Sequence, residues 1–477
     1  MHKDRTGKIE KLEEKLKTVR EENRQLKKSI KRVEESREKW KKKASSRLSD
    51  CKRLMLRSSR QGVMPNLPRH SYPLWVMGLS VQLRILCNCS YNSIRKILPL
   101  LYSLFFSKQG VSWGVPCRQT IENWVHKVGH DQLENNVQGR KGEEVCVFID
   151  ESIRVGTERL LLVLYCPAWK IADGCLTFKD VSVLYLRGSD EWTSTTIEQH
   201  LQRVFSEKGA KVKYLTSDEG NNLKKATRLL GSVHVPDISH VMATCLRRVF
   251  SKDDDYMSLL RAVGKIQAKL SMGQDAYLRP PKQRAKARFL NQVPLLHWAQ
   301  CVFAKWDRLS EKAQQKLSPL LQNRSVLADL KECLSLSDHI GIMFKSHGLT
   351  SDTLQEAVEI LQKEFSGRTA KFVEQLRGYL AQYREILCQL GKDKNIHVCS
   401  DVIESLFGVY KSRVSDNYFV GTTALSLELP LICLSDKQLS ECIEQALIGV
   451  KMSHLKHWKN SDNSHSQAFK RRELLKL

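Results

Sequence analysis

Two short apolar segments of this chain each lead to an acidic residue, and this feature constrains the fold most. Val145–Asp150 (V-C-V-F-I-D) is a run of five apolar residues that ends at Asp150. Val212–Thr216 (V-K-Y-L-T) leads in the same way through a serine to Asp218. A short apolar run bounded by polar residues is typical of a buried central strand. Neighbouring strands of this kind would bring two carboxylates to one end of a sheet, where they could share divalent metal ions. For either acid alone, a strand that simply ends at the surface is the simpler explanation.

Further periodic segments predict a single sheet with helices between its later strands. The other three strands are predicted at Leu160–Cys166, Val181–Leu186 and Ser232–Pro236. Short connections make the first three strands an antiparallel meander. Helical segments are predicted at Thr193–Ser206, Asn221–Leu230 and His240–Phe250. Three strands, helix, strand, helix and strand is the order of a ribonuclease-H-like α/β domain.

The net charge favours a polyanionic partner. Among 477 residues, 78 are Lys or Arg and 52 are Asp or Glu, which gives a formal charge of +26. Nucleic acid is the commonest polyanion, and a membrane surface is the competing partner. Residues 72–106 are interrupted by charges, so no membrane span is expected, and the charged N-terminus does not resemble a signal peptide. The 14 cysteines form no C-x-x-C pair, which argues against a zinc ribbon or a disulfide framework and favours reduced thiols in a cytoplasm.

The first 40 residues contain an apolar repeat that predicts a coiled coil. Its members recur at alternating steps of three and four over about five heptads, as the a and d positions of a coiled coil do. They are Ile9, Leu12, Leu16, Val19, Asn23, Leu26, Ile30, Val33, Arg37 and Trp40. Asn23 falls at an a position, where a buried amide pair favours a parallel dimer. A solvated single helix is the alternative.

A basic segment follows this repeat. It opens with Lys41, Lys42 and Lys43, and residues 1–60 as a whole carry 22 basic and 10 acidic side chains. Nearly half of the net charge of the chain therefore lies here. Such a segment suits contacts with DNA phosphates, which strengthen binding to any sequence.

Residues 72–129 show helical periodicity and end in a helix with a polar outer face. Pro116 suits the first turn of that helix. Its core face is formed by Ile121, Trp124 and Val125. Its outer face is formed by Arg118, Gln119 and Asn123. Those side-chain types bond to base edges and phosphates in a major groove. We therefore predict a helix-turn-helix, with an ordinary helical hairpin as the alternative.

The segment 255–390 shows only helical periodicity and predicts a large helical insertion. A basic, proline-marked stretch, 279–288, interrupts it. The residues of this stretch that could follow a DNA backbone are Lys282, Arg284, Lys286 and Arg288. A solvated surface loop explains them equally well.

A third acid comes from the segment 400–411 (S-D-V-I-E-S-L-F-G-V-Y-K), in which Ser400 can cap a helix. The polar face of that helix is formed by Asp401, Glu404, Gly408 and Lys411. A charged face is usually only solvated. Here the glycine permits close approach of a backbone and the lysine can contact phosphate, which suits a helix laid against a metal site.

With these segments in place, the chain resembles the DDE transposases encoded by bacterial insertion sequences. The resemblance rests on F-I-D-E-S at Asp150, L-T-S-D-E-G at Asp218 and D-V-I-E-S-L-F-G-V-Y-K at Glu404. Asp237 and His240 look like the C/D-x-x-H element that several such families carry after the second acid. Helical insertions between the second and third acids also occur in this superfamily. The resemblance spans residues 115–477, and the N-terminal coiled coil is not part of the general pattern.

The resemblance implies an enzyme that cleaves DNA at the ends of an insertion sequence and transfers the strands to target DNA. Two Mg²⁺ (or Mn²⁺) ions would be held by Asp150 as the bridging ligand and by Asp218 and Glu404. Lys411 and His240, with Asp237, would assist. The expected partners are terminal inverted repeats, target DNA and a second copy of the chain, in a bacterial cytoplasm and associated with the nucleoid.

Two other functions fit the same sequence. One is a DNA-binding repressor or domesticated transposase that no longer cuts and keeps the acids as relics. The other is a ribonuclease-H-like nuclease or resolvase, which would cut DNA without joining it. Terminal inverted repeats and short target duplications in the flanking genomic DNA would favour the transposase.

The predicted fold is multidomain α+β. The predicted boundaries are 1–45 for the coiled coil, 46–70 for a basic linker, 71–135 for a helical DNA-binding domain, 143–254 and 396–450 for the two parts of the catalytic domain, 255–395 for the helical insertion and 451–477 for a basic tail.

The coiled coil can be tested by deletion. Removing residues 9–40 should lower the mass measured by light scattering from that of a dimer to that of a monomer. Asn23→Leu should stabilise the coiled coil but broaden the range of oligomers, because the buried amide no longer selects one register. An unchanged mass after the deletion would show that these residues do not dimerise the chain.

Overall fold

The computed structural model describes residues 30–31, 34–39, 42, 67–106, 114–135, 142–151, 158–169, 174–282, 292–413, 423–461, 471 and 474–475. The chain divides into two units, Met1–Leu74 and Trp75–Leu477. In the first unit, the described residues between 30 and 42 are helical and exposed. Most of the predicted coiled coil, Asn23 included, lies outside the described residues, so the coiled coil stays a prediction.

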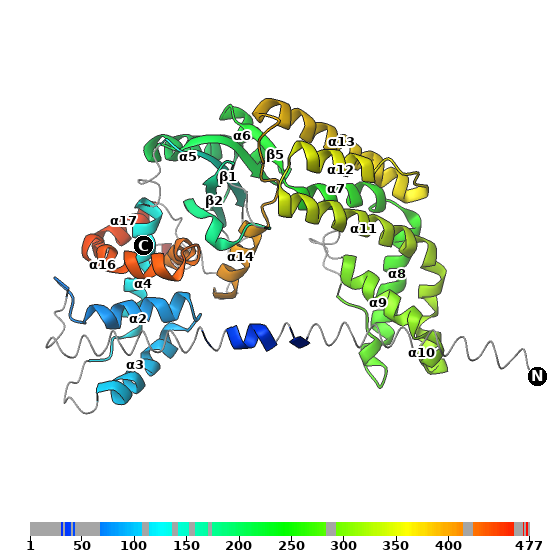
Figure 1. The fold of residues 1–477 in the computed structure, drawn as a ribbon. Coiled ribbons are helices and arrows are strands. Elements are labelled where there is room, and N and C mark those ends of the chain that lie inside the picture. The colour runs from blue at the N-terminus through cyan, green and yellow to red at the C-terminus, as the bar shows by residue number, and fades with distance from the viewer. Residues whose placement is uncertain are drawn as a thin grey trace, which may run out of the picture. The chain divides into compact units, whose positions relative to one another are not determined.

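A five-stranded mixed sheet forms the centre of the second unit (Figure 1). Its strands are β1 (Glu144–Glu151), β2 (Arg159–Pro167), β3 (Ser182–Ser189), β4 (Lys211–Ser217) and β5 (Val233–Pro236). The strand order is β3-β2-β1-β4-β5. β1 pairs antiparallel with β2 and parallel with β4, and β4 pairs parallel with β5. This order and these directions confirm the predicted ribonuclease-H-like sheet.

Alternation along the strands assigns each side chain to one of two cores. In β1, Val145, Val147 and Ile149 pack with α5 (Ser194–Lys208) and α6 (Asn221–Leu229). Cys146 and Phe148 belong to the core on the opposite face, which α7 (Ile238–Phe250) covers. The strands are apolar on both faces because helices cover both faces of the sheet.

The predicted helical insertion is present in the described residues between α7 and α14. Its α-helices are α8 (Asp254–Lys269), α9 (Gln292–Ala304), α10 (Glu311–Leu317), α11 (Arg324–His347), α12 (Ser351–Ile360) and α13 (Gly367–Leu390). α13 packs against α7, and its Tyr383 hydroxyl donates to the Pro236 carbonyl at the end of β5, 2.9 Å away. Arg368 on α13 bridges Asp253 and Asp329 at 2.8 Å each. The insertion thus shares a continuous core with the sheet.

A second helical group joins both ends of this unit. Its N-terminal part is α2 (Leu74–Ile85), α3 (Tyr91–Phe106) and α4 (Arg118–Asn135), and its C-terminal part is η8 (Ala424–Glu428), α15 (Leu429–Ile432), α16 (Asp436–Gly449) and α17 (Met452–Ser461). α4 packs against all four C-terminal elements. Gly129 allows this packing, because a Cβ there would lie 1.8 Å from the Leu427 carbonyl oxygen. These contacts join segments that the sequence places in three separate domains.

A buried carboxylate lies at the centre of this helical group. Glu428 is 1% exposed and accepts from Arg84 at 2.7 Å and from Arg413 at 2.6 Å. The Tyr91 hydroxyl donates to the same carboxylate. Two guanidinium groups and a phenol therefore offset the cost of desolvating one carboxylate, and they tie α2 and α3 to η8 and to α14 (Asp401–Arg413).

The Glu428 network should dominate the stability of the helical group. Glu428→Gln would leave two buried guanidinium groups without their counter-charge, so we expect the free energy of unfolding to fall by about 3–5 kcal/mol in urea titrations. The control is Glu441→Gln on α16, whose ion pair with Lys437 is exposed, and which should change stability by no more than about 1 kcal/mol. Equal effects of the two substitutions would contradict this role for Glu428.

Candidate functional site

The first two predicted acids lie at the same end of neighbouring parallel strands. Asp150 is the seventh residue of β1, and Asp218 directly follows β4. Asp150 lies two residues after Phe148, which packs on the α7-facing side of the sheet. Asp218 lies two residues after Thr216, whose hydroxyl bonds to the segment leading into α14 on the same side. Because side chains alternate along a strand, the Asp150 carboxylate is directed to the face covered by α7 and α14, and the Asp218 charge lies near it.

A tight turn fixes Asp218. The Gly220 amide donates to the Asp218 Oδ1 atom at 2.9 Å. A Cβ at Gly220 would lie 2.8 Å from that same oxygen, so the turn favours glycine. The preceding Ser217 hydroxyl lies 3.0 Å from the His234 Nε2 atom on β5. The second acid is therefore held at the strand end by a short, hydrogen-bonded loop.

The third acid comes from α14 and faces a histidine on α7. The Glu404 Oε1 atom lies 3.1 Å from the His240 Nε2 atom. The side chains are 50% and 30% exposed, respectively, so solvent reaches both. α14 also contacts β1, the strand that carries Asp150. The predicted face of α14 is thereby directed toward the two strand-end acids.

The segment before α14 is bonded to the sheet along its length. The His397 carbonyl accepts from the Thr216 hydroxyl at 2.7 Å, and the His397 amide donates to the Tyr214 hydroxyl at 2.9 Å. The Ile238 amide donates to the Val398 carbonyl at 2.8 Å. Residues of β4 and the first residue of α7 therefore position the start of α14.

Asp237 completes this connection. It is fully buried, and its Oδ1 atom accepts the His240 amide at 2.9 Å. Its Oδ2 atom accepts both the amide and the hydroxyl of Ser400, the hydroxyl at 2.9 Å. The sequence predicts that the Ser400 hydroxyl caps α14, whereas in the structure this hydroxyl donates to Asp237. Asp237 caps α7 and anchors α14 at the same time.

Asp401, the other acid in the first turn of α14, is engaged elsewhere. Its Oδ2 atom lies 2.6 Å from the Lys345 Nζ atom on α11, and its Oδ1 atom accepts from the Ser239 hydroxyl at 2.8 Å. The Lys345 ammonium holds the pKa of Asp401 below its usual range, against the opposing effect of burial. Sequence reasoning did not find Lys345, because it lies 56 residues before Asp401 and belongs to no motif.

Lys411 lies on the same face of α14 as Glu404. Burial lowers its pKa, while the negative charges of Asp150 and Glu404 act to raise it. Lys411 therefore lies within the field of both acids, as the sequence predicts. The structure does not test the predicted close approach at Gly408. An added Cβ would meet nothing within 4 Å, so no described neighbour approaches its backbone and the space beside it is open.

Burial and neighbouring charges strongly shift the pKa values of two groups of the site, Asp150 and His240. Burial, with the nearby Asp218 charge, raises the pKa of Asp150 to about 7, and Glu404 acts in the same direction. The hydrogen bond to Glu404 raises the pKa of His240 to about 9, helped by Asp237 and Asp218. At neutral pH, His240 is therefore a cation among carboxylates. Such clustered perturbations are typical of functional sites.

The donor atoms suit a hard divalent cation. Magnesium and manganese prefer carboxylate oxygens, and Asp150, Asp218 and Glu404 offer only such oxygens. The carboxylate oxygens of these three acids do not all lie within 4.8 Å of one another, unlike the ligand atoms of two other groups described in the next paragraph. A pair of metal ions about 3.5–4 Å apart places its outer ligands farther apart than a single ion does, so acids that hold two ions need not all lie within 4.8 Å of one another.

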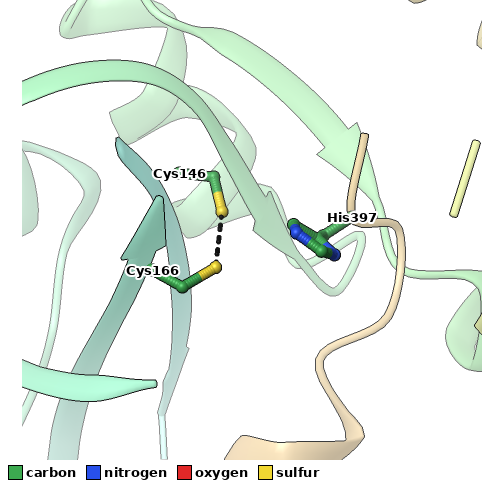
Figure 2. A group of neighbouring side chains, drawn as sticks. All are labelled: Cys146, Cys166 and His397. Carbon is green, nitrogen blue, oxygen red and sulfur yellow. Dashed lines mark hydrogen bonds between the residues drawn. The ribbon is translucent and has the colours of Figure 1, made fainter. Parts of the chain in front are cut away.

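Two tighter groups of donors occur among the described residues. Cys146 and Cys166 face each other across β1 and β2 with their sulfur atoms 3.2 Å apart, and His397 lies beside them (Figure 2). All three are buried, and in the part of the chain that the structure describes no fourth cysteine, histidine or acid joins the group. Structural zinc takes four ligands, so we interpret the trio as part of the core. The second group combines Asp237 and Asp401 with Cys399, and both carboxylates already have the partners given above.

The predicted DNA-contacting residues are only partly described. Arg118 and Gln119 are exposed on α4, and Asn123 is half-buried. Arg118 lies 3.9 Å from Glu122, and the Gln119 amide donates to Asn123 at 3.2 Å. Lys42 and Lys282 are exposed. Lys41, Lys43, Arg284, Lys286 and Arg288 lie outside the described residues, as do residues 107–113 between α3 and α4, so the helix-turn-helix stays a prediction.

Comparison with solved structures gives a distant likeness. No known protein family matches the sequence, and no curated protein matches it. The chain is similar to a solved structure, the Drosophila P element transposase strand transfer complex, at a TM-score of 0.38 and 12% sequence identity, covering 86% of this chain and 100% of that chain. A likeness of this size assigns neither a family nor an activity. Separately, none of the described helices is long and apolar enough to cross a membrane.

The raised pKa of Asp150 predicts a pH-dependent stability. A carboxyl whose pKa is higher in the folded state opposes folding when ionised, so the cost is complete above about pH 7 and fades toward pH 4. Asp150→Asn should therefore stabilise the metal-free protein by about 0.5–2 kcal/mol at pH 8 and by much less at pH 5, as measured by urea unfolding. The exposed Glu356→Gln on α12 is the control. A gain that is independent of pH would show that Asp150 is not the titrating group.

Proposed function

We propose that this protein is a DNA transposase that cleaves the ends of a mobile element and joins them to target DNA. The observation that carries the proposal is the meeting of Asp150, Asp218 and Glu404 on one face of a ribonuclease-H-like sheet. Two of these acids end adjacent parallel strands, and the third faces His240 from α14. The origin in a bacterial insertion sequence, and hence a place beside the bacterial chromosome, belongs to the same proposal.

The roles of the acids follow from their places. Both Asp218 and Glu404 raise the pKa of Asp150, so both charges lie near it. In this proposal Asp150 would contact both Mg²⁺ or Mn²⁺ ions, and Asp218 and Glu404 would each hold one. When bound, two such ions activate the attacking oxygen, stabilise the leaving oxygen and neutralise the phosphate charge. The attacking groups would be water in cleavage and the released 3′-hydroxyl in strand transfer.

His240 and Lys411 would supply positive charge around the acids. His240, with a pKa of about 9, is protonated at neutral pH and offsets the repulsion between the carboxylates when no cation is bound. If Glu404 turns to a cation, His240 loses this partner and can donate to a phosphate or a nearby carboxylate. Lys411 projects from the same face, near the open space at Gly408, where a DNA backbone could approach.

DNA would be held through further basic residues. In this proposal Lys42 with its neighbours Lys41 and Lys43, and Lys282 with the basic stretch after it, contact phosphates and contribute to binding of any sequence. Arg118, Gln119 and Asn123 contact the terminal repeats. Because Gln119 and Asn123 bond to each other in the structure, base contacts would require them to exchange that bond for bonds to DNA. A dimer formed through the N-terminal coiled coil would bring two element ends together.

Single substitutions of the three acids test the proposal. Asp150→Asn, Asp218→Asn and Glu404→Gln should each lower Mg²⁺-dependent cleavage by at least about a thousandfold while leaving DNA binding within about twofold, because binding and chemistry depend on different residues. The substrate is a plasmid that carries the genomic DNA flanking the gene, assayed with Mg²⁺ and with Mn²⁺. Glu356→Gln serves as the control.

The outcomes separate the alternatives. If one acid variant keeps near-normal cleavage, that residue is wrongly assigned. If the unmodified protein binds the flanking DNA and never cuts it, a repressor or domesticated transposase is the better description. Cleavage without joining would indicate a nuclease or resolvase.

A further inference from the structure

We propose that Lys345, on the helical insertion, is a positioning residue that fixes α14 and so sets the place of Glu404. This inference rests on the proposed metal site and assigns part of that site's geometry to the insertion. Lys345 lies in the last turn of α11, and its Nζ atom is 2.6 Å from the Asp401 Oδ2 atom. The Lys345 side chain is 26% exposed, so the ion pair is partly shielded from solvent.

The Lys345 ion pair belongs to a longer seam between the insertion and the start of α14. Leu349 and Ile396 exchange two backbone hydrogen bonds, of 2.8 and 3.0 Å. The Asn395 side chain donates to the His347 carbonyl at 2.9 Å. The residues after α11 therefore run beside the segment that leads into α14. Lys345 extends this seam from the backbone to the first turn of the helix itself.

The ion pair between Lys345 and Asp401 affects Glu404 because Asp401 and Glu404 lie on the same helix. The two acids lie three residues apart, on the same face of one helix, so a shift or rotation of the first turn moves both. The Asp401 carboxylate is held from two sides, by Lys345 on α11 and by Ser239 on α7. These bonds also occupy a carboxylate that could otherwise compete with Glu404 for a cation or for His240.

The sign of the effect on cation binding separates positioning from simple electrostatics. Lys345→Met removes a positive charge near the acids. If Lys345 acted only through its charge, the loss would strengthen cation binding. If Lys345 positions Glu404, the loss should weaken cation binding by about tenfold, as removal of a residue that orients a metal ligand does. Lys345→Arg keeps both the charge and the bond and should bind cations nearly as the unmodified chain does.

The matched control is Lys316→Met. Lys316 also lies in the insertion and pairs with Asp275 at 2.6 Å, with its side chain 34% exposed. The substitution therefore removes the same charge and a similar ion pair, at a place outside the seam. Its effect on stability should resemble that of Lys345→Met, and its effect on Mn²⁺ binding should be small.

The experiment titrates Mn²⁺ alone into the full-length protein and follows the free ion by electron paramagnetic resonance. Thermal melting of every variant without Mn²⁺ shows whether it is folded. We expect Lys345→Met to bind Mn²⁺ about tenfold more weakly, with Lys345→Arg and Lys316→Met close to the unmodified chain. Unchanged or tighter binding by Lys345→Met would overturn the inference.

A further variant distinguishes failure of the inference from failure of the proposed function. Glu404→Gln should weaken Mn²⁺ binding at least as much as Lys345→Met does. If Glu404→Gln leaves Mn²⁺ binding unchanged, the metal site itself is wrongly assigned and the inference falls with it. If Glu404→Gln weakens binding and Lys345→Met behaves as Lys316→Met does, the metal site stands and only the role of Lys345 is rejected.

Discussion

The candidate site depends on the buried carboxylate of Asp237. This side chain bonds to the His240 amide on one side and to the amide and hydroxyl of Ser400 on the other. It thereby fixes the start of α7 to the start of α14, which lie 163 residues apart. Burial raises the pKa of Asp237, and the nearby His240 charge and these donors oppose that rise. A buried carboxylate costs much free energy unless it is paired and hydrogen-bonded, so loss of either helix start would leave Asp237 unsatisfied.

The same junction explains how a long helical insertion can interrupt the site without displacing it. The chain leaves the sheet through α7 and returns through His397 and Val398, which bond to Thr216, Tyr214 and Ile238. Both ends of the insertion are therefore fixed to the ends of β4 and β5. Closing a longer connection adds only slowly to its entropic cost, so the number of residues between these ends is weakly constrained. The hydrogen bonds that fix the two ends of the insertion, by contrast, are tightly constrained.

Sequence patterns predict the sheet well and the partners in the site poorly. Continuous apolar runs are visible because each strand is buried on both faces, and Asp150 and Asp218 can be located because they end such runs. Helical periodicity places Asp401 and Glu404 on one face and cannot say what either meets. Lys345 comes from a distant helix, and the Ser400 hydroxyl bonds to Asp237 although its type suits a cap. These contacts are tertiary, and no local rule contains them.

The different surroundings of Asp401 and Glu404 show how two acids on one helix face can differ in how firmly the fold holds them. Asp401 bonds to an ammonium and a hydroxyl, and Lys345 stabilises its charged form. Glu404 is half exposed and bonds to His240, a single ring that solvent also reaches. Among the described residues, an incoming cation must displace two bonds of Asp401 but one bond of Glu404. Exchange of partners is therefore easier at Glu404 than at Asp401.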